Sequence, residues 1–343
     1  MKAVVIHEFG PPEVLSYEDV PDPIPARGEV RVRVHATTVN RVLDVAVRRG
    51  EQRQRGVELP LILGVDCAGV VDRIGPSVEG VRLGDRVAAA GRMALEVGEP
   101  GAPVREGMIG LHRPGGFAEL ICVPASATTS VPERLPFHDA AVVMRHCPTA
   151  WNLLCNVAKL RRGEWVLVMG AGGNLGSVGI QIAKNVIGAK VITAAGSRER
   201  AQAGLRLGAD HAIDYSSQNL LEEVMAATEG KGVDVLYDNI ANPKILPQAF
   251  LGLGHNGRLV TAGAHGGPRV TIDFFHLYDR RITIYGMPGS DPADREKCFL
   301  AAAQGKIKAK IAHVLPLSQA VEAHRMMERD PGMGKIVLDP TLG

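Results

Sequence analysis

The sequence predicts a two-domain α/β protein, in which a doubly wound parallel sheet follows a small β-rich domain. The length of 343 residues suggests two domains of about 100–200 residues each. The first 125 residues carry short apolar or alternating runs between Gly and Pro, whereas the chain from about residue 128 alternates apolar strands with helical patterns. Repeated strand–helix units indicate a parallel sheet covered by helices.

The N-terminal part shows the pattern of a small β-barrel or sandwich. Turn signals such as Gly10-Pro11-Pro12 and Gly84-Asp85 separate its predicted strands. These strands cover residues 3–6, 29–35, 68–74, 86–90 and 118–123.

The rest of the chain predicts the parallel sheet. Its strands are the apolar runs 165–169, 191–195, 211–214, 233–237 and 258–262, and residues 281–286 predict the last strand. Between the fourth and fifth runs, Asn242-Pro243 predicts a helix start, because an N-cap residue precedes Pro at the first helical position.

The composition excludes several functional classes. With 45% hydrophobic and 22% charged residues the chain is globular rather than disordered. Lys and Arg total 39 against 37 Asp and Glu, a balance that argues against a nucleic-acid partner. The apolar runs are too short for a membrane span, and the start of the chain does not have the pattern of a signal peptide. We therefore expect a cytoplasmic protein with a small-molecule substrate.

The glycines after the run 165–169 predict a dinucleotide site of the Rossmann type. Gly170 and Gly173 allow a tight turn and a close approach of the backbone to a pyrophosphate, and Gly176 lets the following helix pack on the strand. Gly172 lies in the same turn, and Asn174 and Leu175 open the helix. A purely structural turn is the alternative, and the strand–turn–helix context disfavours it.

The end of the second strand predicts NADP(H) rather than NAD. An NAD site carries Asp or Glu about 20 residues after the turn, yet no acid occurs from Gly176 to Arg198. Ser197, Arg198 and also Arg200 are suited to hold a 2′-phosphate through charge-assisted hydrogen bonds. Alternatively, the two arginines belong to a solvated first helical turn with Glu199 between them.

The motifs together resemble one family, the medium-chain dehydrogenase/reductase superfamily in its zinc-independent quinone oxidoreductase and enoyl reductase branch. They run nearly from end to end: LGVDCAGVV (63–71), GDRV (84–87), GGFAE (115–119), TAW (149–151), GAGGNLG (170–176), AGS (195–197), LGA (207–209) and GKIV (334–337). The resemblance implies a GroES-like domain of residues 1–127 and 290–343, a Rossmann domain of residues 128–289, and a site in the cleft between them. The cofactor site predicted on this basis also includes Thr149, Gly196, Tyr215, Asn239, Gly263 and Ala264.

The resemblance also predicts that no metal is bound. Zinc-dependent members place a Cys where this chain has Arg41, a His where it has Val65, and a further Cys where it has Arg145. None of these three side chains can coordinate zinc. The lobe that holds a structural zinc in such relatives corresponds to residues 91–116, which contain no cysteine. The five cysteines are scattered and form no CxxC pair, which also argues against a disulfide framework.

The proton donor of the branch is missing as well. Relatives commonly carry a Tyr two residues after an Asp, and counted from Asp44 that position is Ala46. The remaining candidates for catalysis are Asn40, Arg41 and His146, the last as a general acid near neutral pH. A structural or exposed His146 is the competing interpretation.

These features predict an NADPH-dependent, zinc-independent reductase of a quinone or an activated C=C bond, with an apolar substrate that carries one carbonyl. Two alternatives stay open: an NADPH-binding sensor or crystallin-like protein with little turnover, and an alcohol dehydrogenase. By analogy with relatives we also expect a homodimer that pairs through the edge strand 281–286, whereas Asp279, Arg280 and Arg281 would protect that edge in a monomer.

Overall fold

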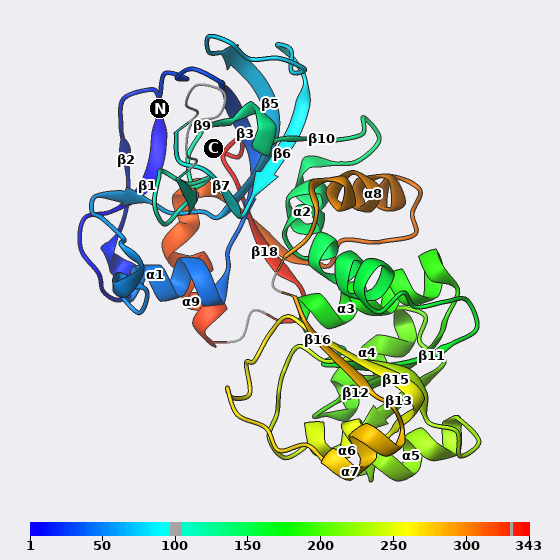
Figure 1. The fold of residues 1–343 in the computed structure, drawn as a ribbon. Coiled ribbons are helices and arrows are strands. Elements are labelled where there is room, and N and C mark those ends of the chain that lie inside the picture. Colours follow the sequence, from blue (N-terminus) through cyan, green and yellow to red (C-terminus); the bar gives the residue numbers. More distant parts are fainter. Residues whose placement is uncertain (97–104, 288, 330–331) are drawn as a thin grey trace. The chain divides into compact units, whose positions relative to one another are not determined.

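The chain folds into two compact units. The computed structural model describes residues 1–96, 105–287, 289–329 and 332–343. Unit 1 comprises Met1–Arg145 and Ala309–Gly343, and unit 2 comprises His146–Lys308 (Figure 1). These borders fall later in the chain than the domain borders predicted from the sequence. Helix α2 (Phe137–Trp151) begins in unit 1 and ends in unit 2, and helix α8 (Pro292–Ala303) belongs to unit 2.

Unit 1 is the β-rich part. Its largest sheet has the strand order β10-β6-β5-β3-β18-β17, with β9 also paired to β3, and the smaller sheets are β2-β1-β4 and β7-β8. The strands are β1 (Lys2–Ile6), β2 (Leu15–Asp19), β3 (Glu29–Thr38), β4 (Leu61–Ile62), β5 (Asp66–Ile74), β6 (Arg86–Ala90), β7 (Arg92–Ala94), β8 (Glu106–Met108), β9 (Leu120–Pro124), β10 (Thr129–Ser130), β17 (Ile311–Pro316) and β18 (Lys335–Asp339). The helices are η1 (Pro12–Val14), η2 (Arg41–Val45), α1 (Ala46–Arg48), η3 (Arg53–Arg55), η4 (Ala125–Ala127), η7 (Leu317–Gln319) and α9 (Ala320–Arg329).

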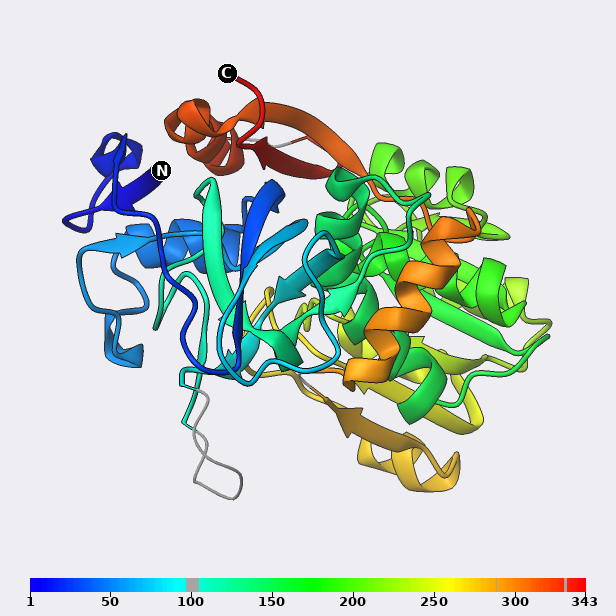
Figure 2. The same ribbon diagram turned by 90° about the horizontal axis from the view of Figure 1, so that it is seen from above.

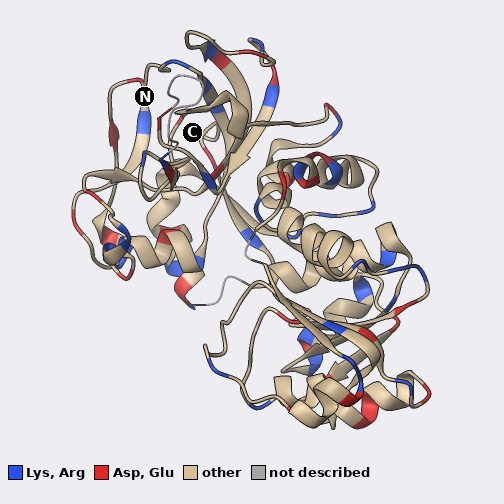
Figure 3. Cartoon of the chain, in the orientation of Figure 1, with Lys and Arg blue, Asp and Glu red and all other residues tan. Residues whose placement is uncertain are grey.

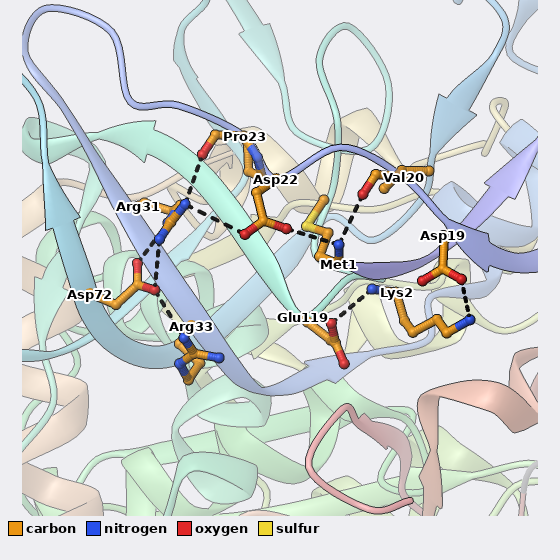
Figure 4. A network of polar contacts seen from close by, with 10 residues as sticks. All are labelled: Met1, Lys2, Asp19, Val20, Asp22, Pro23, Arg31, Arg33, Asp72 and Glu119. Atoms are coloured by element: carbon orange, nitrogen blue, oxygen red, sulfur yellow. Dashed lines mark hydrogen bonds and ion pairs between the residues drawn. The ribbon is translucent and has the colours of Figure 1, made fainter.

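Strand β3 shows why this sequence folds as a sheet with one buried face. Its valines at positions 30, 32 and 34 are buried, as the period of two requires, and the residues between them turn outward. On that outer side Arg31 Nε donates to Asp72 Oδ1 of β5 (2.8 Å), and Arg33 Nη2 donates to Asp72 Oδ2 (3.2 Å). Figure 4 shows that this network continues through Asp22 to the amino group of Met1, which donates to Asp22 Oδ1 (2.8 Å).

Unit 2 holds a six-stranded parallel sheet with the order β13-β12-β11-β14-β15-β16. The strands are β11 (Trp165–Met169), β12 (Lys190–Ala195), β13 (His211–Asp214), β14 (Val233–Tyr237), β15 (Leu253–Thr261) and β16 (Thr283–Gly286). The helices are η5 (Asn152–Val157), α3 (Asn174–Gln181), η6 (Ile182–Ile187), α4 (Arg198–Arg206), α5 (Leu220–Ala227), α6 (Leu246–Leu251), α7 (Phe274–Asp279) and α8. Apart from η5, which precedes β11, they follow the strands in the alternation that a parallel sheet requires. Figures 1 and 2 show helices lying against the sheet of unit 2. The predicted α/β fold class is therefore confirmed.

One predicted helix start is wrong. Helix α6 begins at Leu246 rather than after Asn242. The side chain of Asn242 accepts the N–H of Lys244 (2.9 Å), Ala241 adopts a positive φ of 53°, and residues 243–245 form a turn. A second proline, Pro247, then occupies the first helical turn.

Charge is dispersed over both units. Figure 3 shows basic and acidic segments interspersed along the chain, in line with the net charge of +2. None of the helices in the described residues combines the length and the hydropathy that a membrane span requires.

Candidate functional site

The cofactor residues predicted from the sequence gather at one edge of the parallel sheet in unit 2. In such a sheet all strands end at the same edge, and ligands bind where the strand order reverses, here between β11 and β14. Gly170 to Gly176 follow β11, Gly196 follows β12, Tyr215 follows β13, Asn239 follows β14, and Gly263 with Ala264 follows β15. Thr149 lies half-buried in the last turn of α2, away from these strand ends in sequence.

The glycine turn after β11 is shaped for an anion. Gly170 adopts a φ of +75°, and the N–H of Gly173 donates to its carbonyl oxygen (2.9 Å). A side chain at Gly176 would collide with that same oxygen, so only glycine lets α3 start this close to β11. Gly173 is the N-cap of α3, and the first N–H groups of a helix have no partner within it. This helix end can therefore bind a pyrophosphate.

The first turn of α4, which follows β12, places a basic side chain against the glycine turn. Cγ of Arg200 lies 3.0 Å from the position that a Cβ of Gly172 would take, so the arginine stem packs on the turn. Ser197 caps α4 by accepting the N–H of Arg200 (3.4 Å), and Arg198 is exposed. The ring of Tyr215 lies against Gly196, and the nearby Arg200 charge opposes the rise in the Tyr215 pKa that burial causes.

The ends of β14 and β15 are held together by a hydrogen bond from main chain to side chain and by a close approach of their main chains. Asn239 is buried, and its Oδ1 accepts the N–H of Ala262 (3.2 Å). A Cβ on Gly263 would lie 2.7 Å from the carbonyl oxygen of Asn239, so glycine permits this approach. Asp238 accepts the N–H of Ala241 (2.8 Å) and fixes the turn after β14. These residues fit a nicotinamide dinucleotide, because the start of α3 can take the pyrophosphate and no acidic residue occurs from Gly176 to Arg198.

A second polar cluster is buried in unit 1, around Asp66 at the start of β5. Its Oδ1 accepts the N–H of Thr38 (2.6 Å) and the hydroxyl of Thr37 (3.3 Å). Its Oδ2 accepts the hydroxyl of Thr38 (2.5 Å) and Nδ2 of Asn40 (3.3 Å). Four donors thus converge on one fully buried carboxylate.

Lys335 and Asp44 complete this cluster. Nζ of Lys335 donates to Oδ1 of Asn40 (2.6 Å), and Asp44 accepts the N–H groups of Asn40 (2.7 Å) and Gly64 (3.1 Å). Burial, with the charge of Asp66, raises the pKa of Asp44 to about 7, and burial also raises the pKa of Asp66. Burial lowers the pKa of Lys335 to about 8, although the Asp66 charge opposes this. The cluster therefore contains groups that titrate near neutral pH.

The three candidate catalytic residues have different surroundings. Asn40 is buried, and both ends of its amide are engaged within the cluster. Arg41 follows it and is exposed at the start of η2. His146 is half-buried in α2 and belongs to unit 2. Ala46, the position of the missing tyrosine, is buried.

The structure offers zinc no suitable ligands at the positions that zinc-dependent relatives use. Arg41 and Arg145 are cations, Val65 is fully buried and apolar, and the lone pairs of Asp66 are taken by Thr37, Thr38 and Asn40. No group of three or more potential metal ligands occurs in the described residues. Strands β7 and β8 belong to the segment 91–116, and residues 97–104 of it lie outside the described part.

Sequence reasoning gave no role to Lys335, Asp66 or Asp44. Lys335 and Asp66 each open a strand whose other residues are mostly apolar, and an isolated charge in such a run is a usable signal of a buried ion. Their convergence on Asn40 had no signal in the sequence, because it depends on the pairing of β3 with both β5 and β18.

Comparison with known proteins gives matches along the whole chain. A family model described as "Alcohol dehydrogenase GroES-like domain" matches residues 26–133, and one described as "Zinc-binding dehydrogenase" matches residues 175–304. Pig quinone oxidoreductase is 30% identical over 350 residues, covering 98% of this chain and 97% of its own. A 2-haloacrylate reductase from a Burkholderia species is 31% identical over 351 residues, covering 98% of both chains.

Solved structures agree over the same length. An NAD-dependent alcohol dehydrogenase has a TM-score of 0.87 and 35% identity, covering 99% of both chains. A mycobacterial protein solved in complex with NADPH has a TM-score of 0.78 and 28% identity, covering 99% of this chain and 100% of that one. The expected combination of a GroES-like and a Rossmann-type domain is confirmed.

Proposed function

Since the chain belongs to the medium-chain dehydrogenase/reductase superfamily, in its quinone oxidoreductase-like branch, we propose that it reduces a quinone or an activated C=C bond with NADPH. Membership of this branch makes the protein an oxidoreductase that uses a nicotinamide cofactor. The choice of NADPH and the class of substrate are the proposal.

The choice of NADPH is carried by Arg200. Its stem packs on Gly172 at the phosphate-binding turn, and no carboxylate stands at the end of β12 to bind a free ribose hydroxyl. With Arg198 on the same helix and the N-terminus of α4 beside it, this position favours a 2′-phosphate. The packing of the Arg200 stem on the turn favours a phosphate site over the alternative of a helical turn that contacts only solvent.

The substrate class is supported by what the named relatives share. A quinone and a 2-haloacrylate both present an electrophilic carbon conjugated to a carbonyl or carboxyl oxygen. Alcohol oxidation, which the name of one structural neighbour suggests, needs a group that lowers the pKa of the alcohol. Zinc cannot supply it here, because Arg41, Val65 and Arg145 provide no ligand atoms.

Bound NADPH supplies a hydride, and the protein supplies binding, orientation and charge. The N–H groups at the start of α3 would hold the pyrophosphate, and Arg200 with Arg198 would hold the 2′-phosphate. Gly263 lets the chain after β15 approach the carbonyl oxygen of Asn239 after β14 closely. No tyrosine donates the proton from the position used in relatives, since Ala46 occupies it.

Paired binding and turnover measurements test this proposal. The panel contains quinones, enones and α,β-unsaturated acids, each with NADPH and NADH. We expect NADPH oxidation with at least one class, and R200Q should weaken NADPH binding by tens of fold with little effect on NADH, because a charged contact is worth about 1.5–3 kcal/mol. R198A should act in the same direction, and R206Q, in the last turn of α4, is the matched control.

Equal affinity of the unmodified protein for both cofactors would refute the NADPH assignment. NADPH binding without oxidation across the whole panel would instead favour the sensor or crystallin-like alternative.

A further inference from the structure

Tyr237 is the last residue of β14, and its side chain is fully buried. Its ring reaches α3, because a Cβ on Gly179 of that helix would lie 2.8 Å from Cε1 of the ring. The hydroxyl donates to the carbonyl oxygen of Leu175 (3.2 Å), in the first turn of α3. Burial raises the pKa of Tyr237, so the hydroxyl keeps its proton at neutral pH. One buried side chain therefore connects β14 to the start of the helix that follows β11.

This hydrogen bond acts on a peptide group at the anion-binding end of α3. The carbonyl of Leu175 belongs to the same planar peptide group as the N–H of Gly176. The helical ladder begins one residue later, where the N–H of Ser177 donates to the carbonyl oxygen of Gly173 (2.9 Å). The N-cap Gly173 has no side chain to bind the N–H groups before it. The N–H of Gly176 is therefore among those that would hold a pyrophosphate.

Packing alone does not orient this peptide group. Gly176 is buried, and a Cβ there would collide with the carbonyl oxygen of Gly170, so contact sets how closely α3 approaches β11. Contact of this kind has little directional preference, whereas a hydrogen bond has a preferred angle. A donor on the carbonyl oxygen of Leu175 also polarises the peptide group, which strengthens the N–H of Gly176 as a donor. Tyr237 thus supplies the orientation that packing leaves open.

We propose that Tyr237 is a positioning residue for the cofactor, whose hydroxyl orients the Leu175–Gly176 peptide group and thereby the N–H that would bind the pyrophosphate. This inference rests on the nicotinamide cofactor of the proposed function. Tyr237 acts through the main chain, since its side chain is fully buried. NADPH and NADH share the pyrophosphate, so the effect of Tyr237 is the same on both. Arg200, in contrast, acts on the 2′-phosphate alone.

A purely structural role makes a different demand on this position. A buried hydroxyl needs an acceptor wherever it lies, so Y237F would then lower stability and leave the affinity of the folded protein unchanged. Two variants of unit 2 serve as controls. V224A removes two carbon atoms from a buried valine of α5 and controls for lost stability. Y278F removes the hydroxyl of an exposed tyrosine of α7.

The first readout is hydrogen exchange of peptides that cover residues 174–178, compared with peptides that cover β12. We expect Y237F to exchange faster at residues 174–178 than the unmodified protein, with a much smaller change in β12, because only the start of α3 loses a bond. V224A should change both sets of peptides alike, and Y278F should change neither. This measurement needs no ligand and no turnover.

The second readout is the affinity for NADPH and for NADH, followed by the fluorescence of the reduced nicotinamide at a temperature where every variant is folded. We expect Y237F to bind both cofactors about three- to tenfold more weakly, which is the range that one neutral hydrogen bond gives, with the preference between them unchanged. V224A and Y278F should bind both as the unmodified protein does. On whichever substrate is reduced, KM for NADPH should rise by the same factor while kcat at saturating NADPH stays the same.

Unchanged exchange at residues 174–178 in Y237F would overturn the inference, as would unchanged cofactor affinity or a loss confined to NADPH. If Y237F does not fold, G179A decides, because its Cβ displaces the ring of Tyr237 from α3 while the hydroxyl is kept. G179A should weaken both cofactors alike, and unchanged binding would overturn the inference. NADPH binding without oxidation refutes the proposed function only, since exchange and affinity are measured without turnover.

Discussion

Replacing Asp44 with asparagine is expected to change how the stability of unit 1 depends on pH. Burial, with the charge of Asp66, raises the pKa of Asp44 from 3.8 to about 7 in the folded protein. Between these two values the folded state holds a proton that the unfolded chain has released, so the free energy of unfolding falls as pH rises. The contribution is fully present below pH 3.8 and is lost as pH passes about 7.

The size of the effect follows from the two pKa values. At 1.36 kcal/mol per pKa unit, the rise from 3.8 to about 7 corresponds to about 4 kcal/mol, of which about 2 kcal/mol falls between about pH 5.5 and 7.5. An asparagine side chain cannot ionise, so between about pH 5.5 and 7.5 the free energy of unfolding of D44N should rise by about 2 kcal/mol relative to that of the unmodified protein. D44N should also lose about 1–3 kcal/mol of unfolding free energy at every pH, because the NH₂ group of the new side chain faces the N–H of Asn40 or of Gly64 and two donors cannot pair.

The assay must report on unit 1. Both tryptophans, Trp151 and Trp165, belong to unit 2, so intrinsic fluorescence does not follow this event. Hydrogen exchange of the peptides that cover β5 and β18, corrected for the intrinsic exchange rate at each pH, measures the relevant opening free energy. E133Q, which removes an exposed carboxylate of unit 1, is the control. If the opening free energies of D44N and of the unmodified protein change in parallel with pH, Asp44 is not held protonated in the folded protein.

Three further outcomes are expected. G176A should lose cofactor binding and about 1–3 kcal/mol of stability in thermal unfolding, because the new Cβ collides with the carbonyl oxygen of Gly170. G289A is the control and should leave both properties unchanged, since no atom lies near the position of its Cβ. Analytical ultracentrifugation should give a dimer of twice the 36.5 kDa chain mass, because the edge strand β16 leaves Ile284 and Tyr285 about 40% exposed. The variant T283P should dissociate this dimer, since proline cannot donate a main-chain hydrogen bond, and a monomer of the unmodified protein at micromolar concentration would refute the dimer. Elemental analysis should find well under one zinc per chain. If the protein instead holds one zinc per chain, and a chelator removes both the zinc and the activity, the conclusion that Arg41, Val65 and Arg145 leave no zinc site is wrong.

The strands of unit 2 and the turns at their carboxyl ends, where we propose that the cofactor binds, were predictable because their signals are local. Each strand is an apolar run that ends in a turn, and the positions of Gly170, Gly173 and Gly176 reflect contacts within a few residues of one another. The start of α6 was not predictable in this way, because Asn242 can cap a helix or form a turn, and in the structure its side chain accepts the N–H of Lys244 within a turn that precedes the helix.

The cluster of unit 1 could not be predicted because it joins distant parts of the chain. Asn40 suggests a free amide that could reach a substrate, yet Lys335, close to the end of the sequence, occupies its oxygen. The pairing of β3 with β18 brings these two residues together, and Val337 lies opposite Thr38.

The turn after β11 is part of the fold itself, whereas the start of α4 is exposed, and this difference affects how cofactor preference can change among related proteins. Gly176 is buried against the main chain of Gly170, so a change there alters the fold itself. Arg198 and Arg200, which we propose to select the phosphorylated cofactor, are exposed, and substitutions at exposed positions usually change stability by no more than about 0.5 kcal/mol. Cofactor preference can therefore drift, or be redesigned, across a few solvent-facing positions while the architecture that holds the dinucleotide is inherited intact.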